Sequence, residues 1–342
     1  MPDSPAQKLR SWAAPLARAA GRLFRSRGQG DQEEIVWFLD LATFFRGTWH
    51  LAGWAFSRGP AIQALEFHLG DKEPAARLEA FDPSPDVAQQ HGPAAAKCRF
   101  RLAGRLADGP RYGAWWMVVH LADGRCLTVE GLQNNLAGDP YHLLVNRFFH
   151  ETLPSLGSGR VLEVGSRARS GVSRRDLIPP ELEYVGMDIA PGENVDVVGD
   201  AHELSAAFPA GHFAAIFSMS VFEHLLMPWK VVLEMNRILA PGGLVMITTH
   251  HTFPLHDQPW DFWRYSGDAW QALFNSATGF QIVDTALGEP AAIVPVFSHA
   301  LLNGLDQQPA FLANTVLARK TGESQLSWPV KLAEVVDSRY PA

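Results

Sequence analysis

The pattern of hydrophobic and polar positions in this chain changes near residue 136. Before it, short runs rich in β-branched and aromatic residues are separated by Gly-Pro, Pro-Ser-Pro and Asp-Gly steps. The runs are IVWFLD, WHLAGWAF, AIQALEFHLG, KCRFRLAG, GAWWMVVHL and RCLTVEGL. Such runs are typical of antiparallel strands, and residues 122–124 supply a hairpin turn between the last two. We therefore expect an antiparallel β-sandwich over residues 35–136.

After residue 136, apolar runs of strand length alternate with helical periodicity. One helix is expected after Pro140. Another begins at Pro228 and stops at Pro241-Gly-Gly, just before the strand LVMITT. Alternation of strands and helices favours an α/β fold with a parallel sheet, and we place this second domain at residues 137–322.

Further elements are expected toward the end of this domain. A helix begins near Ser266, a sixth strand covers residues 280–287 and a seventh covers residues 315–320. The segment between these strands is longer than a hairpin needs, and its run AAIVPVFSHALL is a candidate helix that shields a site or meets a partner. Residues 323–342 form a C-terminal tail.

Three carboxylates stand in or at the end of consecutive strand-like runs. Glu163 lies two positions before the glycine turn of VLEVGS, Asp188 closes LEYVGMD and Asp200 closes VDVVGD. Ligands bind at the carboxyl edge of parallel strands, because backbone N–H groups and helix N-termini point there. Gly165 would allow close approach of the backbone, and a carboxylate about 20 residues further on can accept from ribose hydroxyls. The spacing predicts a nucleoside pocket.

The glycine turn lacks the fingerprint of a dinucleotide site. In Gly165-Ser-Arg-Ala-Arg-Ser-Gly171, Arg167 replaces the second glycine of G-x-G-x-x-G and the spacing is longer. A pyrophosphate needs close backbone approach at that position. The chain is therefore a weak candidate for a dehydrogenase, and a nucleoside cofactor without a diphosphate fits better.

Residues from about 140 to 320 resemble a class I S-adenosylmethionine-dependent methyltransferase of the type 11-like kind. The matching motifs are VLEVGS, YVGMD, GDAHEL, FAAIFSMSVFEHL and EMNRILAPGGLVMITTH, in this order. The resemblance implies a Rossmann-like seven-stranded methyltransferase domain, preceded here by the antiparallel β-sandwich domain, and S-adenosylmethionine as the cofactor. Arg167 departs from the family pattern in the loop around the methionine part.

The resemblance also implies where the cofactor would be bound. Around its methionine part would lie Glu163, Gly165, Ser166 and Arg167. The ribose hydroxyls would meet Asp188, and the adenine would meet Ile189, Asp200 and the N–H of Ala201. Beneath the sulfonium would lie Ser218, Met219 and Ser220.

Several of these residues also have a purely structural interpretation. A strand-end aspartate often caps the following helix, since its side chain accepts from backbone N–H groups that have no partner. Glu163 stands in an apolar run, where an unpaired charge is costly, so it needs a specific partner. Glu223 and His224 of the FEHL motif would orient the loop and cap the next helix, or His224 would contact the substrate.

The chemically densest segment, residues 250–265, follows the fifth strand at the sheet edge of the predicted pocket. It contains three histidines, two aspartates, an arginine and several aromatic residues. Methyl transfer needs an aligned acceptor, and a general base helps when that acceptor is a hydroxyl. The candidate base is His256, and Asp257 or Asp261 would orient it. Arg264 would bind an anionic part of the substrate, and Tyr265 would donate a hydrogen bond to it. These five are the candidate catalytic residues.

Other interpretations of this region stay open. Asp261 and Arg264 are also placed to form an internal ion pair that holds the loop. A metal site would draw on His250, His251, His256 and Asp257, but their spacing matches no familiar ligand set, so no metal is expected. Tyr141, in the helix after Pro140, is a candidate lid over the cofactor or an interdomain packing residue.

Composition sets outer limits on the function. The chain has 342 residues, of which 47% are hydrophobic and 19% charged, enough for two globular domains. Its net charge of −7 argues against nucleic acid as a partner, because binding to phosphates relies on a basic surface. Two cysteines, Cys98 and Cys126, are too few for a disulfide scaffold, and both are expected to be buried free thiols. With no apolar run long enough to span a bilayer, a cytoplasmic location is expected.

The first 34 residues differ from the rest. Basic residues are opposed only by Asp3 before residue 31, and apolar residues fall at helical spacing after Pro15. This pattern favours either a basic amphipathic helix in peripheral contact with an anionic membrane, at the inner membrane face, or a solvated tail. Residues 28–34 then form a linker.

The sandwich module carries several tryptophans that could stack on sugars, namely Trp37, Trp49, Trp54, Trp115 and Trp116. Packing is the competing role, since neighbouring strand residues face opposite sides. The element Gly53-Trp-Ala-Phe56 resembles small sandwich modules of bacterial enzymes of surface-glycan synthesis. We therefore expect O- or N-methylation of a small-molecule or glycan-linked acceptor, in glycan biosynthesis. The alternative is a non-catalytic glycan-binding or assembly scaffold with a degenerate methyltransferase fold.

Overall fold

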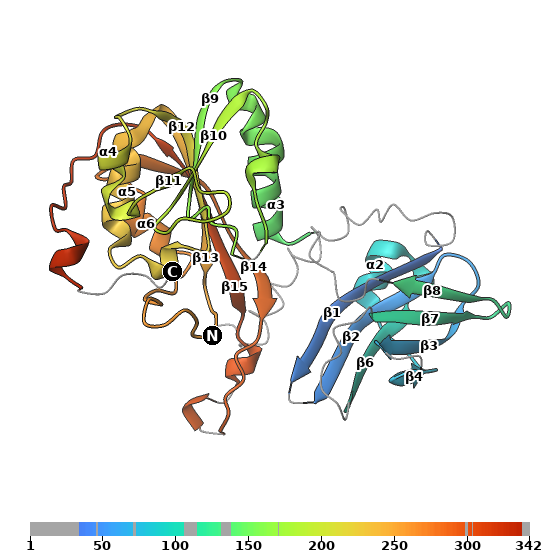
Figure 1. The fold of residues 1–342 in the computed structure, drawn as a ribbon. Helices are drawn as coiled ribbons and strands as arrows, with labels where there is room; N and C mark the ends of the chain where they lie inside the picture. The colour runs from blue at the N-terminus through green and yellow to red at the C-terminus, as the bar shows by residue number, and fades with distance from the viewer. Residues whose placement is uncertain are drawn as a thin grey trace, which may run out of the picture. The chain divides into compact units, whose positions relative to one another are not determined.

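The computed structural model describes residues 34–45, 47–70, 73–105, 115–130, 138–169, 171–297, 300–302 and 304–336. The basic tail, except Glu34, and the last residues of the C-terminal tail lie outside this description. The chain divides into two compact units, one ending at Gly138 and the other beginning at Asp139 (Figure 1). No described helix is long and apolar enough to cross a bilayer.

The first unit contains two four-stranded antiparallel sheets. One has the order β1 (Ile35–Phe45), β2 (Thr48–Ser57), β6 (Lys97–Arg105), β5 (Asp82–Pro83). The other has the order β4 (Ala76–Leu78), β3 (Ile62–Leu69), β7 (Trp115–Leu121), β8 (Cys126–Glu130). Leu51 of the first sheet and Leu65, Phe67 and Val119 of the second share one core, which confirms the β-sandwich. A short helix, α2 (Pro85–His91), and a 3-10 turn, Pro93–Ala95, precede β6.

The tryptophans of this unit are used mainly in packing. Trp49 is buried, Trp37 and Trp115 pack against the core, and Trp54 stacks on Phe56. Trp116 stacks on His68 with ring centroids 4.7 Å apart. The prediction for the cysteines is half right, because Cys98 is buried and Cys126 is exposed. Cys126 lies near the turn of the β7–β8 hairpin, on the side of the strand that faces away from the core.

The second unit is built on one seven-stranded sheet. Its order is β11 (Val197–Val198), β10 (Leu182–Asp188), β9 (Gly159–Val164), β12 (Phe213–Met219), β13 (Leu239–His250), β15 (Ala310–Lys320), β14 (Phe280–Ala291). The first five strands pair in parallel, and β15 is antiparallel to both its neighbours. The chain starts in the middle at β9, runs outward to β11 and returns to β12. Strand order therefore reverses between β9 and β12, which is where such sheets bind ligands.

Helices cover both faces of this sheet (Figure 1). On one face lies α3 (Pro140–Arg147), which continues into a π-helical turn, Phe148–Thr152; on the other lie α4 (Leu204–Ala207), α5 (Pro228–Ile238) and α6 (Ala269–Leu273). Alternate strand residues serve the two layers, since Val161 packs with the α3 layer and Leu162 with the α5 layer. The remaining helical segments are 3-10 turns, at Pro154–Leu156, Arg175–Leu177, Ala201–Glu203, Phe222–His224, Ala300–Leu302, Leu305–Gln307 and Leu332–Glu334.

Two expectations about this unit need correction. The helix expected near Ser266 begins at Ala269, after a turn. The run AAIVPVFSHALL is not an α-helix in its described part: its first residue ends β14, and 3-10 turns follow. Proline cannot donate in a helix and disfavours helical geometry in the residue before it, so Pro295, inside the run, opposes one here. Phe297 and Leu301 are strongly exposed, at 81% and 89%.

Candidate active site

A cavity of about 600 Å³ opens at the carboxyl ends of β9, β10, β12 and β13 in the second unit. Most of the sequence-predicted pocket residues line it, namely Gly165, Arg167, Asp188, Ile189, Asp200, Ala201, Met219 and Ser220, and so do His256 and Asp257. Six others do not line it: Glu163, Ser166, Ser218, Asp261, Arg264 and Tyr265. The strand ends and the loop after β13 therefore contribute to one cavity.

The turn after β9 is possible only with glycine. Gly165 has φ +82°, and a Cβ atom placed there would lie 2.1 Å from Cγ2 of Val221. Its N–H donates to the carbonyl of Met187 over 2.8 Å, which ties the turn to β10. The backbone of this turn thus forms the cavity wall directly, with no side chain in between.

Asp188 is held by backbone donors at the end of β10. Its carboxylate accepts from the N–H of Arg167 at 3.3 Å and from that of Ala190 at 3.0 Å. The side chain of Arg167 folds back so that Nε lies 3.6 Å from Asp188 Oδ1, and this Nε makes no hydrogen bond to a described residue. Arg167 therefore places a positive charge, with its Nε atom buried, beside the carboxylate in the cavity.

Asp200 combines a structural contact with a place in the cavity. Its carboxylate caps the 3-10 turn Ala201–Glu203 by accepting from the N–H of His202, and it lies 2.7 Å from Nδ1 of the same residue. Burial acts to raise the pKa of Asp200, but the hydrogen bonds from His202 outweigh it and the pKa lies below its usual value. Asp200 is thus an anion whose position is fixed.

Glu163 has the specific partners that its place in an apolar run requires. The hydroxyl of Tyr184 donates to it, and Arg174 and Asn194 each approach within 3.5 Å. Burial raises the pKa of Glu163, although these partners oppose the shift. Arg174 lines the cavity whereas Glu163 does not, so Glu163 acts on the site by positioning that arginine.

Two of the predicted serines point away from the cavity. Ser218 is fully buried in β12 and donates to the carbonyl of Val164 over 2.9 Å, which joins two neighbouring strands. The hydroxyl of Ser166 is buried. Ser220, with φ +54°, does line the cavity. The sequence places all three near the strand ends but does not show which way each side chain points.

The loop of residues 250–265 is closed on itself. The N–H of Tyr265 donates to the carbonyl of His250 over 2.9 Å, so the two ends of the loop meet. Inside it, Arg264 makes a two-pronged ion pair with Asp261 at 2.6 and 2.7 Å and donates to the carbonyls of Phe253 and Pro254. This pair holds the pKa of Asp261 well below its usual value. Arg264 thus holds the loop through an internal ion pair with Asp261, which is one of the two roles that the sequence left open for it.

Tyr265 is also occupied elsewhere. It is buried against Trp270, and its hydroxyl donates to the carbonyl of Phe222 over 2.9 Å. Burial raises the pKa of this hydroxyl. Arg264 and Tyr265 were predicted to contact the substrate because both follow a strand end. The closed loop turns their side chains away from the cavity.

His256 and Asp257 face the cavity from the same loop. The carboxylate of Asp261 accepts from the N–H of His256 at 3.0 Å and lies 3.5 Å from its Nδ1. Asp257, with φ +47°, lies 3.2 Å from Nη1 of Arg169. The carboxylate that positions His256 is therefore Asp261, and Asp257 contacts Arg169 of the segment after the Gly165 turn.

Glu223 lies at the centre of the histidine-rich wall. Its side chain is fully buried; Oε2 accepts from Thr249 at 2.7 Å, and Nε2 of His250 lies 3.1 Å from Oε1. Burial acts to raise its pKa, but His250 and Thr249 lower it below its usual value. The sequence singled out Glu223 only as a helix-capping candidate. Its carboxylate instead lies among the histidines.

A family model described as a methyltransferase domain matches residues 137–284. The match begins two residues before the second unit and covers the turn of Gly165, both strand-end aspartates and the histidine-rich loop. The matched part of the second unit is a methyltransferase domain. Its strand order, with the seventh strand antiparallel between the fifth and the sixth, is the predicted seven-stranded arrangement.

Solved structures similar to this methyltransferase unit come from several organisms. An S-adenosylmethionine-dependent methyltransferase from Archaeoglobus fulgidus is 16% identical, covers 53% of this chain and 100% of its own, and has a TM-score of 0.37. The YcgJ protein from Bacillus subtilis is 20% identical, covers 50% and 97%, and has a TM-score of 0.35. A putative methyltransferase from Bacillus halodurans is 14% identical, covers 50% and 98%, and has a TM-score of 0.38. A comparison with curated proteins gives no match.

The cavity suits the cofactor of this methyltransferase family, S-adenosylmethionine. Gly165 lines the cavity, so a ligand can approach the backbone of the turn directly. The Nε of Arg167, buried and without a hydrogen-bond partner among described residues, offers a donor for a carboxylate. Asp188 and Asp200 supply acceptors for hydroxyl and amino groups. Donors for an acidic group and acceptors for a nucleoside are both present.

Tyr141 is not among the residues that line the methyltransferase cavity. Asp139 caps α3 by accepting from the N–H groups of Tyr141 and His142, and it also accepts from the N–H of Glu289. The backbone of Gly288 lies so close that a Cβ atom there would be 2.4 Å from Cβ of Tyr141. In this structure Tyr141 packs α3 against β14.

Proposed function

We propose that this methyltransferase transfers a methyl group to a hydroxyl or amino group of a small-molecule or glycan-linked acceptor. The observation that carries the proposal is the position of His256: it lines the same cavity as Asp188 and Asp200, and a buried aspartate supports its ring. An acceptor in the histidine-lined part of the cavity would meet a potential base directly.

S-adenosylmethionine, when bound, supplies both the methyl group and the leaving group, so the protein has to align the acceptor and take up its proton. Asp188 and Asp200 would bind the nucleoside, and Arg167 the acidic end of the methionine part. His256 would accept the acceptor's proton while Asp261 fixes the orientation of the imidazole. Asp257 and Arg169, paired at the rim, would contact polar groups of the acceptor.

The choice of a glycan-linked acceptor rests on the sequence of the first unit and on the polar wall of the cavity. Hydroxyl-rich acceptors need many hydrogen-bonding groups, and three histidines with two carboxylates line this wall, namely His224, His250, His256, Glu223 and Asp257. We also propose a cytoplasmic location, which both free thiols support, with peripheral contact of the basic tail at the inner membrane face.

Calorimetry with S-adenosylmethionine tests the cofactor part of the proposal. Absence of binding at millimolar ligand, with the fold intact by circular dichroism, would leave the scaffold alternative. Cofactor labelled in its methyl group, incubated with extracts of nucleotide sugars and lipid-linked glycans, tests the acceptor. Label in a sugar-containing product supports the proposal, and label only in unrelated small molecules contradicts the glycan part.

A further inference from the structure

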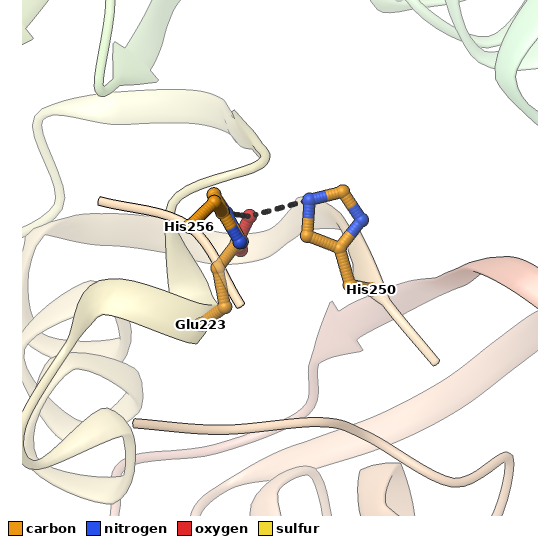
Figure 2. Close-up of side chains that lie close together, drawn as sticks. All are labelled: Glu223, His250 and His256. Atoms are coloured by element: carbon orange, nitrogen blue, oxygen red, sulfur yellow. Dashed lines mark ion pairs between the residues drawn. The ribbon is translucent and has the colours of Figure 1, made fainter. Parts of the chain in front are cut away.

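The wall of the cavity nearest to β13 contains a carboxylate surrounded by imidazole rings. Oε1 of Glu223 lies 3.1 Å from Nε2 of His250 and 3.9 Å from Nε2 of His256. Figure 2 shows both rings directed toward this carboxylate. The donor atoms of Glu223, His250 and His256 all lie within 4.8 Å of one another. A third ring, His224, places its Nε2 3.9 Å from the same oxygen.

The three residues come from three separate segments. Glu223 belongs to the 3-10 turn after β12, His250 is the last residue of β13 and His256 lies in the closed loop. The backbone carbonyl of Glu223 accepts from Phe262 and Trp263 of that loop, at 2.8 and 3.1 Å. The fold thus fixes the separation of the donors through the main chain as well as through the side chains.

The histidine rings are oriented from behind. Nδ1 of His256 lies 3.1 Å from the carbonyl of Pro254 and 3.5 Å from Asp261, and the ring of His250 stacks on Phe253 with centroids 4.0 Å apart. An Nδ1–H that donates to a carbonyl or a carboxylate leaves the Nε2 lone pair directed toward the cluster. This outer support of the His256 ring is characteristic of histidines that bind metal ions.

One oxygen of the Glu223 carboxylate has no hydrogen bond to a described residue. Oε2 is used by Thr249, whereas Oε1 is fully buried and makes no hydrogen bond to another described residue. Nε2 of His250 approaches this oxygen to 3.1 Å, an ion-pair distance. A buried carboxylate oxygen without a hydrogen bond is costly unless a cation or a donor satisfies it. This oxygen points to a ligand that the cluster would bind.

We propose that Glu223, His250 and His256 bind a divalent first-row transition-metal ion, with Zn²⁺ as the representative ion. Two imidazoles and one carboxylate form a common ligand set for catalytic Zn²⁺, which leaves a coordination position open. Ligand atoms about 2.0–2.2 Å from such an ion lie roughly 3.3–3.6 Å apart in a tetrahedral site. The 3.1 Å and 3.9 Å contacts lie on either side of that spacing, so small shifts of the two rings would complete the site.

An ion at this position would face the cavity, because all three ligands line it. Its open position would hold an oxygen or nitrogen atom of the acceptor. This role rests on the proposed function, whereas binding of the ion does not. In the metal-bound protein His256 is a ligand and not a base, and the ion positions the acceptor.

Zinc binding to the full chain tests the proposal. The protein is dialysed against a chelator and then against buffer, and Zn²⁺ is titrated by calorimetry. Wild type should bind one equivalent at this site. His250→Ala, His256→Ala and Glu223→Gln should each raise the Kd for that equivalent of Zn²⁺ at least tenfold. The matched control is His251→Ala, because His251 neighbours His250 but contacts Thr252 and Phe311, and it should bind as wild type does.

Co²⁺ gives a second readout that does not depend on activity, since its visible absorption reports the ligands around the ion. The wild-type spectrum should change in His250→Ala and stay unchanged in His251→Ala. The proposal is overturned if wild type binds no equivalent of Zn²⁺, or if all three variants keep it, which would place the ion at other histidines. Circular dichroism of each variant shows whether it has folded.

Cofactor binding by the chelator-treated protein separates this proposal from the proposed function. If S-adenosylmethionine binds and Zn²⁺ does not, the metal site falls and the methyl-transfer proposal stands. If Zn²⁺ binds and S-adenosylmethionine does not, the metal site stands and the proposed reaction falls.

Discussion

The two walls of the methyltransferase cavity are built in different ways. The cofactor wall consists of strand ends, where Gly165, Asp188 and Asp200 are held largely by backbone hydrogen bonds. The histidine wall consists of the end of β13, a loop and a 3-10 turn. Backbone hydrogen bonds join the loop to the turn, but an ion pair and ring contacts between side chains orient its functional groups. The first wall follows from the parallel sheet itself. The second depends on particular side chains, so substitutions in it should act on chemistry and local stability with little effect on cofactor binding.

The largest effect is expected at the histidine wall, in turnover. In the chelator-treated protein, where His256 would act as the base, His256→Ala should reduce turnover by about 10²–10⁴-fold and leave the Kd for S-adenosylmethionine nearly unchanged. Methyl incorporation into the acceptor fraction identified by labelling measures the first quantity, and calorimetry the second. A comparable loss of cofactor affinity would remove the distinction between the walls.

The next effect is on stability and concerns the closed loop. Arg264→Ala leaves the Asp261 carboxylate, whose side chain is fully buried, without its ion pair, and should cost about 3 kcal/mol of the free energy of unfolding. Denaturant unfolding monitored by circular dichroism measures it. The double variant Arg264→Ala/Asp261→Asn should regain part of the loss, because the unpaired charge is gone. A double variant less stable than Arg264→Ala would contradict this explanation.

A smaller stability effect is expected at the cofactor wall. Gly165→Ala adds a Cβ at positive φ and against Val221, and should cost about 2 kcal/mol and weaken cofactor binding. The companion variant Gly165→Ala/Val221→Ala removes the collision but keeps the strained backbone. Recovery of part of the stability, measured by denaturant unfolding, would separate the two causes. Full stability in the single variant would show that the turn has room to move.

The smallest of these effects is on cofactor affinity alone. Asp188→Asn should weaken S-adenosylmethionine binding about tenfold, since a hydrogen bond to a charged acceptor contributes about 1.5 kcal/mol. Asp176→Asn, an exposed aspartate that does not line the cavity, is the matched control and should bind as wild type does. Equal affinity in the two variants would remove Asp188 from the nucleoside site.

The cofactor wall was predictable because its residues lie next to strand ends in the sequence. Each apolar run ends at the same sheet edge, so Asp188 and Asp200 converge without any knowledge of side-chain contacts. The direction of individual side chains was not predictable. Ser218 points into the sheet rather than the cavity, and Tyr265 points to Phe222, because packing determines the direction of both side chains.

The histidine wall was predictable only in part. Glu223 and His250 are 27 positions apart, and they meet because β12 and β13 are parallel neighbours whose ends are followed by adjacent segments. A systematic pairing of residues just after neighbouring strands would have found this contact. The helix expected within residues 291–302 was wrong because the prediction did not take account of Pro295, which interrupts the run.

The closure of the loop between His250 and Tyr265 bears on how such an enzyme can change during evolution. Its two ends are joined by a backbone hydrogen bond, and its interior is held by its own arginine and aspartate. Because the loop is also joined to the 3-10 turn after β12, where the carbonyl of Glu223 accepts from Phe262 and Trp263, an exchange of the loop has to keep these contacts. Under the proposed function, a change of acceptor would alter this loop, while the strand ends that carry Asp188 and Asp200 stay as they are.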